Sequence, residues 1–197
     1  IELVPTFASL TVFYDCTVIS SAKLKKKIKK LIDNVPSDSR KSAVIWEIPV
    51  CYDGEFAPDM DNVCRHTGLS REQVIDLHTS KPYLIYMLGF LPGFAYLGGM
   101  DERLFTPRLK TPRNEIFEGA VGIGGEQTGI YPVASPGGWQ LIGKTPVKVF
   151  DKSKDDPILY KSGDYIRFYS IDKKEYSDIE TRVLSGSYTP VFGEVEL

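Results

Sequence analysis

The sequence predicts an α+β protein in which a small α/β unit precedes a β-rich barrel or sandwich. In the first eighty residues, strand-like and helical hydrophobic periods follow one another in the order strand, helix, strand, helix, helix. After Pro82, short strand-like runs alternate with glycine and proline turns, which is typical of barrels and sandwiches. We therefore expect an α/β N-terminal subdomain over residues 1–81 and a β domain over residues 82–197, with the boundary near Lys81-Pro82.

The first unit opens with a β-rich apolar run. Ile1–Tyr14 predicts one strand, because apolar and polar residues alternate in its later half. Ser20 or Ser21 then caps a helix whose apolar residues recur at helical spacing, namely Leu24, Ile28, Leu31 and Ile32. Residues 42–50 predict a second strand, and Pro49 places the end of that strand at an edge or a bulge.

Capping signals predict three more helices. A short helix starts at Asp59 and ends at Gly68. Ser70 with Gln73 forms a capping box for the next helix, and Asp172 with Glu175 forms another near the C-terminus. Between them we expect six strands, at residues 83–88, 120–124, 129–133, 139–142, 147–150 and 165–170.

Composition excludes several classes of function. The net charge of −2 gives no basic field for nucleic acid, and no apolar run is long enough to span a membrane, so a cytoplasmic location is expected. The lysine run in the first helix, residues 23–30, is either a patch for an acidic partner or a solvated helix face; without interleaved aromatic residues we favour the solvated face. Three cysteines and two histidines show no metal-ligand spacing, so no metal site is predicted.

The stretch from Met87 to Lys144 holds twelve of the seventeen glycines. Glycine reaches backbone conformations closed to other residues, so this density indicates tight turns and backbone laid close against a ligand, a partner or the protein's own barrel wall. Four blocks in this stretch, in this order and spacing, resemble the KipI and allophanate hydrolase subunit 1 family: GFLPGFAYLGG, LKTPRNEI, GAVGIGGEQTGIYP and SPGGWQLIGKTP. The resemblance reaches back to His78 and forward to Phe168.

The resemblance implies a cyclophilin-like barrel and a subunit of an ATP-dependent 5-oxoprolinase, which opens 5-oxo-L-proline to L-glutamate. It implies two partners, a second cyclophilin-like subunit of the allophanate hydrolase subunit 2 (KipA) type and a third 5-oxoprolinase subunit. This chain would be inactive alone and would itself hold no assigned cofactor, while the assembled complex consumes ATP. The resemblance also implies that a strand and a helix precede Ile1, so the N-terminus is expected to be incomplete.

Two other functions stay open within that family. One is a regulatory protein that binds and inhibits a sensor histidine kinase. The other is allophanate hydrolysis, which ranks last because no Ser/Lys amidase apparatus is found in the sequence.

Candidate site residues fall on the glycine-framed loops and just before them. His78 is a candidate general base because its pKa lies near working pH, although a histidine that satisfies helix-terminal carbonyls is the alternative. Glu126 and Gln127 lie on a glycine-framed turn, as candidate base and orienting donor or as caps of that turn. The loop lacks the Gly-Lys-Ser/Thr ending of a P-loop, so we assign no ATP site to it.

A cationic segment and several aromatic residues complete the candidates. Arg108, Lys110 and Arg113 offer donors to a carboxylate or phosphate, with Arg113 the preferred ligand and a surface loop with ordinary ion pairs the alternative. Further substrate-binding candidates are Tyr131, Trp139 and Gln140. Phe90 and Phe94 either project as anchors for a partner or pack in the core.

One hypothesis connects these candidates. The glycine-framed loops between His78 and Gln140 are expected to shape a cleft that becomes competent only when another polypeptide closes it. Arg113, Glu126, Gln127 and Trp139 are expected to share that cleft.

Overall fold

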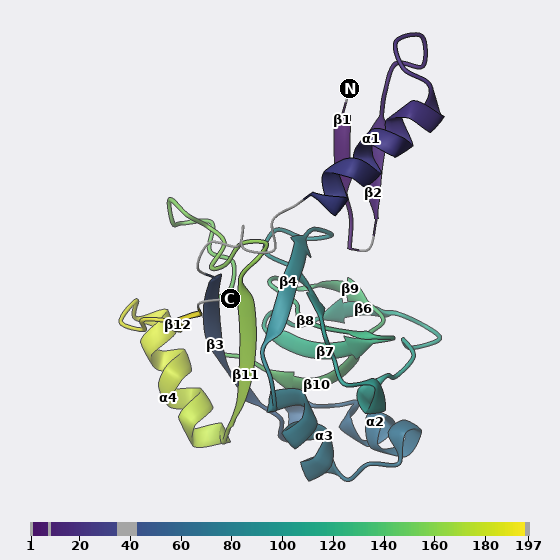
Figure 1. Ribbon diagram of the computed structural model, residues 1–197. Helices are drawn as coiled ribbons and strands as arrows, with labels where there is room; N and C mark the ends of the chain where they lie inside the picture. The colour runs from purple at the N-terminus through teal and green to yellow at the C-terminus, as the bar shows by residue number, and fades with distance from the viewer. Residues whose placement is uncertain (1, 8, 35–42, 196–197) are drawn as a thin grey trace.

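The computed structural model describes residues 2–7, 9–34 and 43–195, and Figure 1 shows how their elements are arranged. They form an α+β fold, as the sequence predicts. A closed barrel with helices around it makes up most of the molecule, and a two-stranded sheet with one helix projects from one end of it. No helix in the described part of the chain is both long and apolar enough to cross a lipid bilayer.

The projecting unit consists of β1 (Glu2–Pro5), β2 (Leu10–Phe13) and α1 (Ser21–Asp33). The expectation of a single strand up to Tyr14 is wrong. The Thr6 backbone N–H donates to the Ser9 carbonyl oxygen at 2.8 Å, so the chain turns and β2 pairs antiparallel with β1. Ile1 and Ala8, which also fell in the expected strand, lie outside the described residues. Helix α1 begins after Ser20 as expected, with the Ser20 hydroxyl accepting from the Lys23 backbone.

The barrel is closed by seven of the described strands. Its order is β10-β7-β8-β5-β4-β11-β3, and the pairing of Lys144 with Cys51 joins β10 back to β3. The bounds of these strands, in chain order, are β3 (Ala43–Cys51), β4 (Tyr83–Leu88), β5 (Ala95–Gly98), β7 (Ala120–Gly124), β8 (Gln127–Ile130), β10 (Gln140–Lys144) and β11 (Tyr165–Ile171). The short strands and glycine turns left a barrel or a sandwich open, and the structure confirms the barrel that the family resemblance implies.

Strand β12 (Val191–Val195) lies outside the closed ring and pairs antiparallel with the first half of β3. A separate two-stranded sheet, β6 (Arg113–Ile116) with β9 (Ser135–Gly137), completes the described strands. The sequence analysis missed β5, β6, β9 and β12. The strand expected at residues 147–150 is wrong, because Phe150 makes only one isolated bridge, to Ile158.

The domain boundary near Lys81-Pro82 stays a prediction, although the eight-stranded sheet contains strands from both sides of it. Strand β3, on its N-terminal side, pairs in parallel with β11 over seven residues and also with β12. The β1–β2 sheet and the eight-stranded sheet are separated along the chain between α1 and β3. Local pattern cannot show this pairing, since the partners of β3 lie more than ninety residues away along the chain. Pro49 lies within β3 opposite Tyr169, at a point between the residues that pair with β12 and with β10.

Helices α2 (Met60–Thr67) and α3 (Arg71–Thr79) pack at the end of the barrel opposite the projecting unit (Figure 1). They contribute Met60, Val63 and Val74 to the main core. Helix α4 (Lys173–Leu184) lies outside the barrel beside β3 and β11. Both predicted capping boxes are present, at α3 and at α4, and Gly68 ends α2 with the expected left-handed conformation.

Candidate functional site

A second hydrophobic core lies outside the barrel and organises the predicted site residues. It contains Phe94, Tyr131 and Trp139, together with Ile116, Ala120 and Leu141, and it is distinct from the main core. The three large rings meet edge to face, with centroids 5.5 Å apart for Phe94 and Tyr131, 5.4 Å for Phe94 and Trp139, and 6.2 Å for Tyr131 and Trp139. Such pairs stabilise beyond their buried area, so the three rings form a rigid aromatic base.

Glycines in β7 and β8 make room for the Trp139 indole. A side chain at Gly124 would collide with the indole nitrogen, and a Cβ at Gly129 would lie 3.2 Å from the far edge of the ring. A Cβ at Gly122 would likewise lie 3.3 Å from the Cβ of Trp139. Of the three alternatives for the glycine-rich stretch, the barrel wall is thus the one that explains these positions. The glycines of the GAVGIGG block therefore serve mainly to accommodate the side chain of Trp139.

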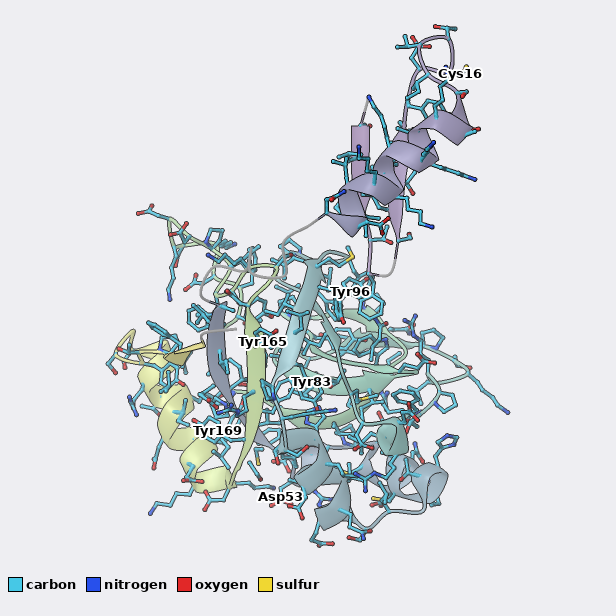
Figure 2. All side chains as sticks on the ribbon, in the orientation of Figure 1. Cys16, Asp53, Tyr83, Tyr96, Tyr165 and Tyr169 are labelled. Carbon is cyan, nitrogen blue, oxygen red and sulfur yellow. The ribbon has the colours of Figure 1, made fainter. Side chains whose placement is uncertain are left out.

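Above this aromatic base lies an open hollow of about 120 Å³. It is lined by five aromatic residues, two glycines and one arginine: Phe90, Phe94, Tyr96, Tyr131, Trp139, Gly137, Gly138 and Arg108. The labelled Tyr96 in Figure 2 lies at the end of the barrel near the projecting unit. Phe7 of that unit reaches Tyr96, with ring centroids 6.4 Å apart.

Arg108 supplies the positive charge of the hollow. Its guanidinium carbon lies 5.8 Å from the centre of the Trp139 ring, within the range of a cation–π contact. Burial raises the pKa of the Tyr131 hydroxyl, and the nearby charges of Arg108 and Arg113 oppose that rise. The hollow therefore combines an apolar aromatic base with an electropositive rim.

Phe90 stands at the edge of the hollow in a strained conformation. It is the described non-glycine residue with positive φ, at 68°, and its side chain is 66% exposed. Its ring meets Phe94 edge to face at 5.7 Å. The loop around it is held by backbone hydrogen bonds, from Gly89 N to Phe94 O and from Phe94 N to Leu91 O. A bulky residue kept in this region costs free energy, and such strain concentrates at functional positions.

Arg113 and Gln140 lie off the hollow and fasten its surroundings. Arg113 Nη2 donates to Asp59 Oδ1 at 2.7 Å, and Asp59 Oδ2 accepts from the Leu141 backbone at 2.7 Å. The Asp59 side chain is only 4% exposed, so this is a nearly buried ion pair that joins the start of α2 to β6 and β10. Gln140 Nε2 donates to the Pro107 carbonyl oxygen at 2.9 Å.

Buried polar atoms remain near this ion pair. Arg113 Nη1, Gln140 Oε1 and Ser135 Oγ have no hydrogen-bond partner among the described residues. Such groups are costly unless a water or a ligand satisfies them. Their presence leaves substrate binding by Arg113 and Gln140 as a prediction, although neither residue lines the hollow.

His78 lies in the barrel core and is fully buried. Its Nδ1 is 2.7 Å from the Tyr52 hydroxyl, its Nε2 is 2.8 Å from the Thr128 hydroxyl, and its ring stacks on Phe168 at 4.6 Å. Thr128 donates its hydroxyl hydrogen to the Gly122 carbonyl, so it accepts from His78 Nε2, and Nδ1 accepts from Tyr52.

This environment determines the charge state of His78. Burial lowers the pKa of the imidazole to about 3, so the ring is neutral near pH 7. Both ring nitrogens are already hydrogen-bonded, and this favours a structural role. The catalytic role of His78 therefore stays a prediction that its placement does not favour.

Glu126 lies on the turn between β7 and β8, and Gln127 is the first residue of β8. Glu126 is exposed, and Gln127 is half-buried and pairs with Gly124. The turn is held against the preceding loop by reciprocal backbone bonds between Thr106 and Gly125. Neither side chain lines the hollow, so Trp139 is the one member of the expected shared cleft that does.

The structure thus brings Phe90, Phe94, Tyr131 and Trp139 together in one hollow. The polar candidates do not line that hollow: His78, Arg113, Glu126, Gln127 and Gln140. Sequence reasoning grouped Tyr96 with Phe90, Phe94 and Trp139 as a possible apolar binding wall, but it missed the contact made by Asp59 and preferred Arg113 over Arg108 as the ligand cation. Pro107 directly precedes Arg108, and nothing in this local sequence predicts that the Arg108 guanidinium contacts the Trp139 ring. Within the described residues, no three acidic, histidine or cysteine side chains converge as a metal site would require.

A larger hollow, of about 750 Å³, lies in the projecting unit. It is lined by apolar residues of β2, α1 and the segment between them, and by four lysines of α1: Val12, Tyr14, Val18, Ile19, Leu24, Lys23, Lys26, Lys27 and Lys30. No predicted site residue lines it. The aromatic hollow is therefore the candidate functional site.

Comparison with known proteins identifies the family. A curated relative from Bacillus subtilis (strain 168), named as the B-type subunit of 5-oxoprolinase, is 46% identical over 186 residues, which cover 89% of this chain and 78% of the relative. The crystal structure of a conserved uncharacterized protein from Pyrococcus horikoshii shares 44% identity, with a TM-score of 0.65 over 89% of this chain and 81% of that one. The Kluyveromyces lactis urea carboxylase shows the same fold at 21% identity, with a TM-score of 0.75 over 98% of this chain and 20% of that one.

The family model described as carboxyltransferase domain, subdomain C and D, matches residues 1–160. This match covers both the projecting unit and the glycine-rich strands whose packing against Trp139 is described above. The chain therefore belongs to the family of carboxyltransferase domains, subdomain C and D.

Proposed function

We propose that this chain is the B-type subunit of an ATP-dependent 5-oxoprolinase and acts with partner subunits to open 5-oxo-L-proline to L-glutamate. The observation that carries the proposal is an aromatic, electropositive hollow that stays open to solvent, in a chain 46% identical to a protein named as a 5-oxoprolinase subunit of this type. Phosphoryl transfer from ATP to the lactam oxygen competes with transfer to water, so bulk solvent has to be kept out of the site during that step. An open hollow on one subunit fits a site that a second subunit completes.

The reaction explains why ATP is required. Transfer of the terminal phosphoryl group of ATP to the lactam oxygen releases ADP and activates the ring carbon. One water then adds to that carbon as the ring C–N bond breaks and the nitrogen leaves as the amine. A second water releases phosphate from the resulting acyl phosphate, which leaves glutamate. No step of the phosphoryl transfer is assigned to residues of this chain.

The residues of this chain would contribute binding and orientation. The rings of Phe94, Tyr131 and Trp139 offer an apolar face to a small ring, and the cations beside them favour an anionic substrate or intermediate. Glu126 remains the candidate base, on a turn that a partner could bring over the hollow. We propose a KipA-type second barrel subunit and a third subunit as the partners, and the cytoplasm as the location.

Reconstitution tests this function. The chain is mixed with the proposed KipA-type second subunit and the third subunit, 5-oxo-L-proline and ATP, and glutamate and ADP are measured. We expect glutamate from the complete set and none when this chain is omitted. A complete set that forms no glutamate, under conditions in which the Bacillus subtilis subunits do, would contradict the proposal.

Phe90 also favours a second candidate, a regulatory protein that binds a sensor histidine kinase. An exposed aromatic ring in a strained loop is as suitable for a kinase surface as for an enzyme subunit. The two candidates differ in what the chain captures from its own cell. Recovery of a kinase without oxoprolinase subunits would favour regulation.

A further inference from the structure

Arg108 is placed differently from the other arginines near the site. Arg113 is paired with Asp59, and Arg103 is paired with Asp101. Arg108 forms no ion pair with a carboxylate of the described residues, and its side chain is exposed while it lies over Trp139. Its five N–H donors are therefore free to take an anion from outside.

The shape of the hollow limits what that anion can be attached to. A volume of about 120 Å³ has room for about four waters at roughly 30 Å³ each, so it suits a small ring and not a nucleotide. Beneath Arg108 the lining is aromatic, and the backbone at Gly137 is pressed so close to Tyr131 that a Cβ there would lie 2.5 Å from the hydroxyl oxygen. An apolar ring can lie on this base while its charge points to the rim.

We propose that Arg108 is the carboxylate anchor of this site and that the hollow selects small cyclic carboxylates. The ring of the ligand lies against Trp139 and Phe94, and the carboxylate takes a two-pronged hydrogen bond from the guanidinium of Arg108. This inference rests on the proposed function for the identity of the acid, 5-oxo-L-proline. It differs from the sequence analysis, which preferred Arg113.

Binding to the isolated full chain tests the anchor without requiring catalysis. The chain contains two tryptophans, Trp46 and Trp139, so a Trp46→Phe background reports on Trp139 alone. Fluorescence is titrated with 5-oxo-L-proline, with 2-pyrrolidinone, which keeps the ring and lacks the carboxylate, with acetate, which keeps only the carboxylate, and with inorganic phosphate. We expect a saturable change with 5-oxo-L-proline, and at least tenfold weaker binding of the other three.

Three variants identify the residue. Arg108→Gln should weaken 5-oxo-L-proline binding at least tenfold and leave the weak binding of 2-pyrrolidinone unchanged. Arg108→Lys should bind with intermediate affinity, because an ammonium keeps the charge and loses the fork. Arg103→Gln is the matched control, since it removes the same guanidinium from an exposed position outside the hollow, where Arg103 is paired with Asp101, and it should bind as the parent does.

The outcomes separate this inference from the proposed function. No saturable change with 5-oxo-L-proline, equal binding of 2-pyrrolidinone, preferential binding of phosphate, or an equal loss in Arg103→Gln would each overturn the anchor. In the assembled complex, Arg108→Gln should raise KM for 5-oxo-L-proline at least tenfold with KM for ATP unchanged. If the wild-type complex makes glutamate and Arg108→Gln leaves both constants unchanged, the anchor fails while the function stands. If the wild-type chain binds as expected and its complex makes no glutamate, the function fails while the anchor stands.

Discussion

His78 shows how far a residue's surroundings can change its chemistry. In the sequence it is a histidine near a domain boundary, and its usual pKa of about 6.5 suits proton transfer. In the folded chain it is buried between Tyr52, Thr128 and Phe168, with both nitrogens hydrogen-bonded. The same side chain becomes a neutral cross-link between α3 and the barrel wall.

The lowered pKa of His78 predicts how stability depends on pH. Between about pH 3 and 6.5 the unfolded chain binds a proton at this residue that the folded chain excludes. The contribution of His78 is therefore fully present above about pH 6.5 and is lost as the pH falls toward 3. We expect the free energy of unfolding to fall by up to about 1.4 kcal/mol per pH unit below pH 6.5 from this residue.

Urea unfolding at a series of pH values between about 5 and 7.5 measures the effect. His78→Gln has no titrating ring. The slope of its unfolding free energy against pH should therefore correspond to up to one fewer proton bound on unfolding, whatever its absolute stability. His66→Gln is the control for the loss of a histidine as such, because His66 is exposed on α2. An unchanged slope in His78→Gln would mean that the buried neutral state is not what makes stability pH-dependent.

At the scale of elements, the hairpin β7–β8 explains the glycine-rich stretch. Its inward residues Val121, Ile123 and Ile130 fill the barrel core, while its outward positions 122, 124 and 129 are glycines under the Trp139 ring. Gly125, at φ 68°, makes the turn between the strands. Successive side chains of a strand point to opposite faces, so this short hairpin packs on both sides. Its inward side chains fill the barrel core, and its three outward glycines leave space for the Trp139 side chain.

This packing predicts the effect of a single methyl group. Gly124→Ala places a Cβ against the indole nitrogen of Trp139, and either the ring or the strand must shift. We expect a loss of about 1–3 kcal/mol in the free energy of unfolding, with a changed Trp139 fluorescence spectrum. Gly193→Ala in β12 is the matched control, since nothing lies within 4 Å of its Cβ, and its stability should change by less than about 0.5 kcal/mol. Equal stability of the two variants would show that the indole does not need the glycine.

The elements differ in how well local sequence predicts them. The capping boxes of α3 and α4 are read correctly, because a cap is a contact between residues three apart. Strands β6 and β9 were missed because each has only three or four residues and pairs only with the other. The β1–β2 hairpin was read as one strand because the Thr6–Ser9 turn lacks both glycine and asparagine.

At the scale of the whole molecule, the chain closes its barrel and leaves its candidate site open. Closure removes most free strand edges, since β10 pairs back to β3. The hollow above the second core has no such closure, and the strained Phe90 stands beside it. An exposed aromatic residue next to an open site is the arrangement expected where a second subunit docks.

We therefore predict that Phe90 contributes to binding of the second subunit, and that its strained conformation lowers the free energy of unfolding of the isolated chain. Phe90→Gly should leave the free energy of unfolding of the isolated chain unchanged or raise it by up to about 1 kcal/mol, because glycine accepts the positive φ. The same variant should bind the second subunit at least tenfold more weakly, as expected for loss of an aromatic anchor. Thermal unfolding and sedimentation of the mixed subunits measure the two effects.

Phe192→Gly is the control for this pair of measurements. Phe192 is 56% exposed on β12 and does not line the hollow, and its ring centroid lies 5.2 Å from that of Trp46. Its replacement should leave binding of the second subunit unchanged. If Phe90→Gly destabilises the isolated chain and binds its partner normally, Phe90 is a packing residue and the docking role is wrong.

The sequence by itself determined the helix caps, the β-rich character after Pro82, the family and the stretch that holds the site, because each depends on residues close together or on order along the chain. Only the tertiary structure decided that His78 is buried, that Asp59 holds Arg113, that Arg108 and not Arg113 lies over Trp139, and that β3 belongs to the barrel. These facts depend on contacts between segments far apart in the chain. Such contacts are set by which surfaces can be buried together, and no local pattern of residue types contains that information.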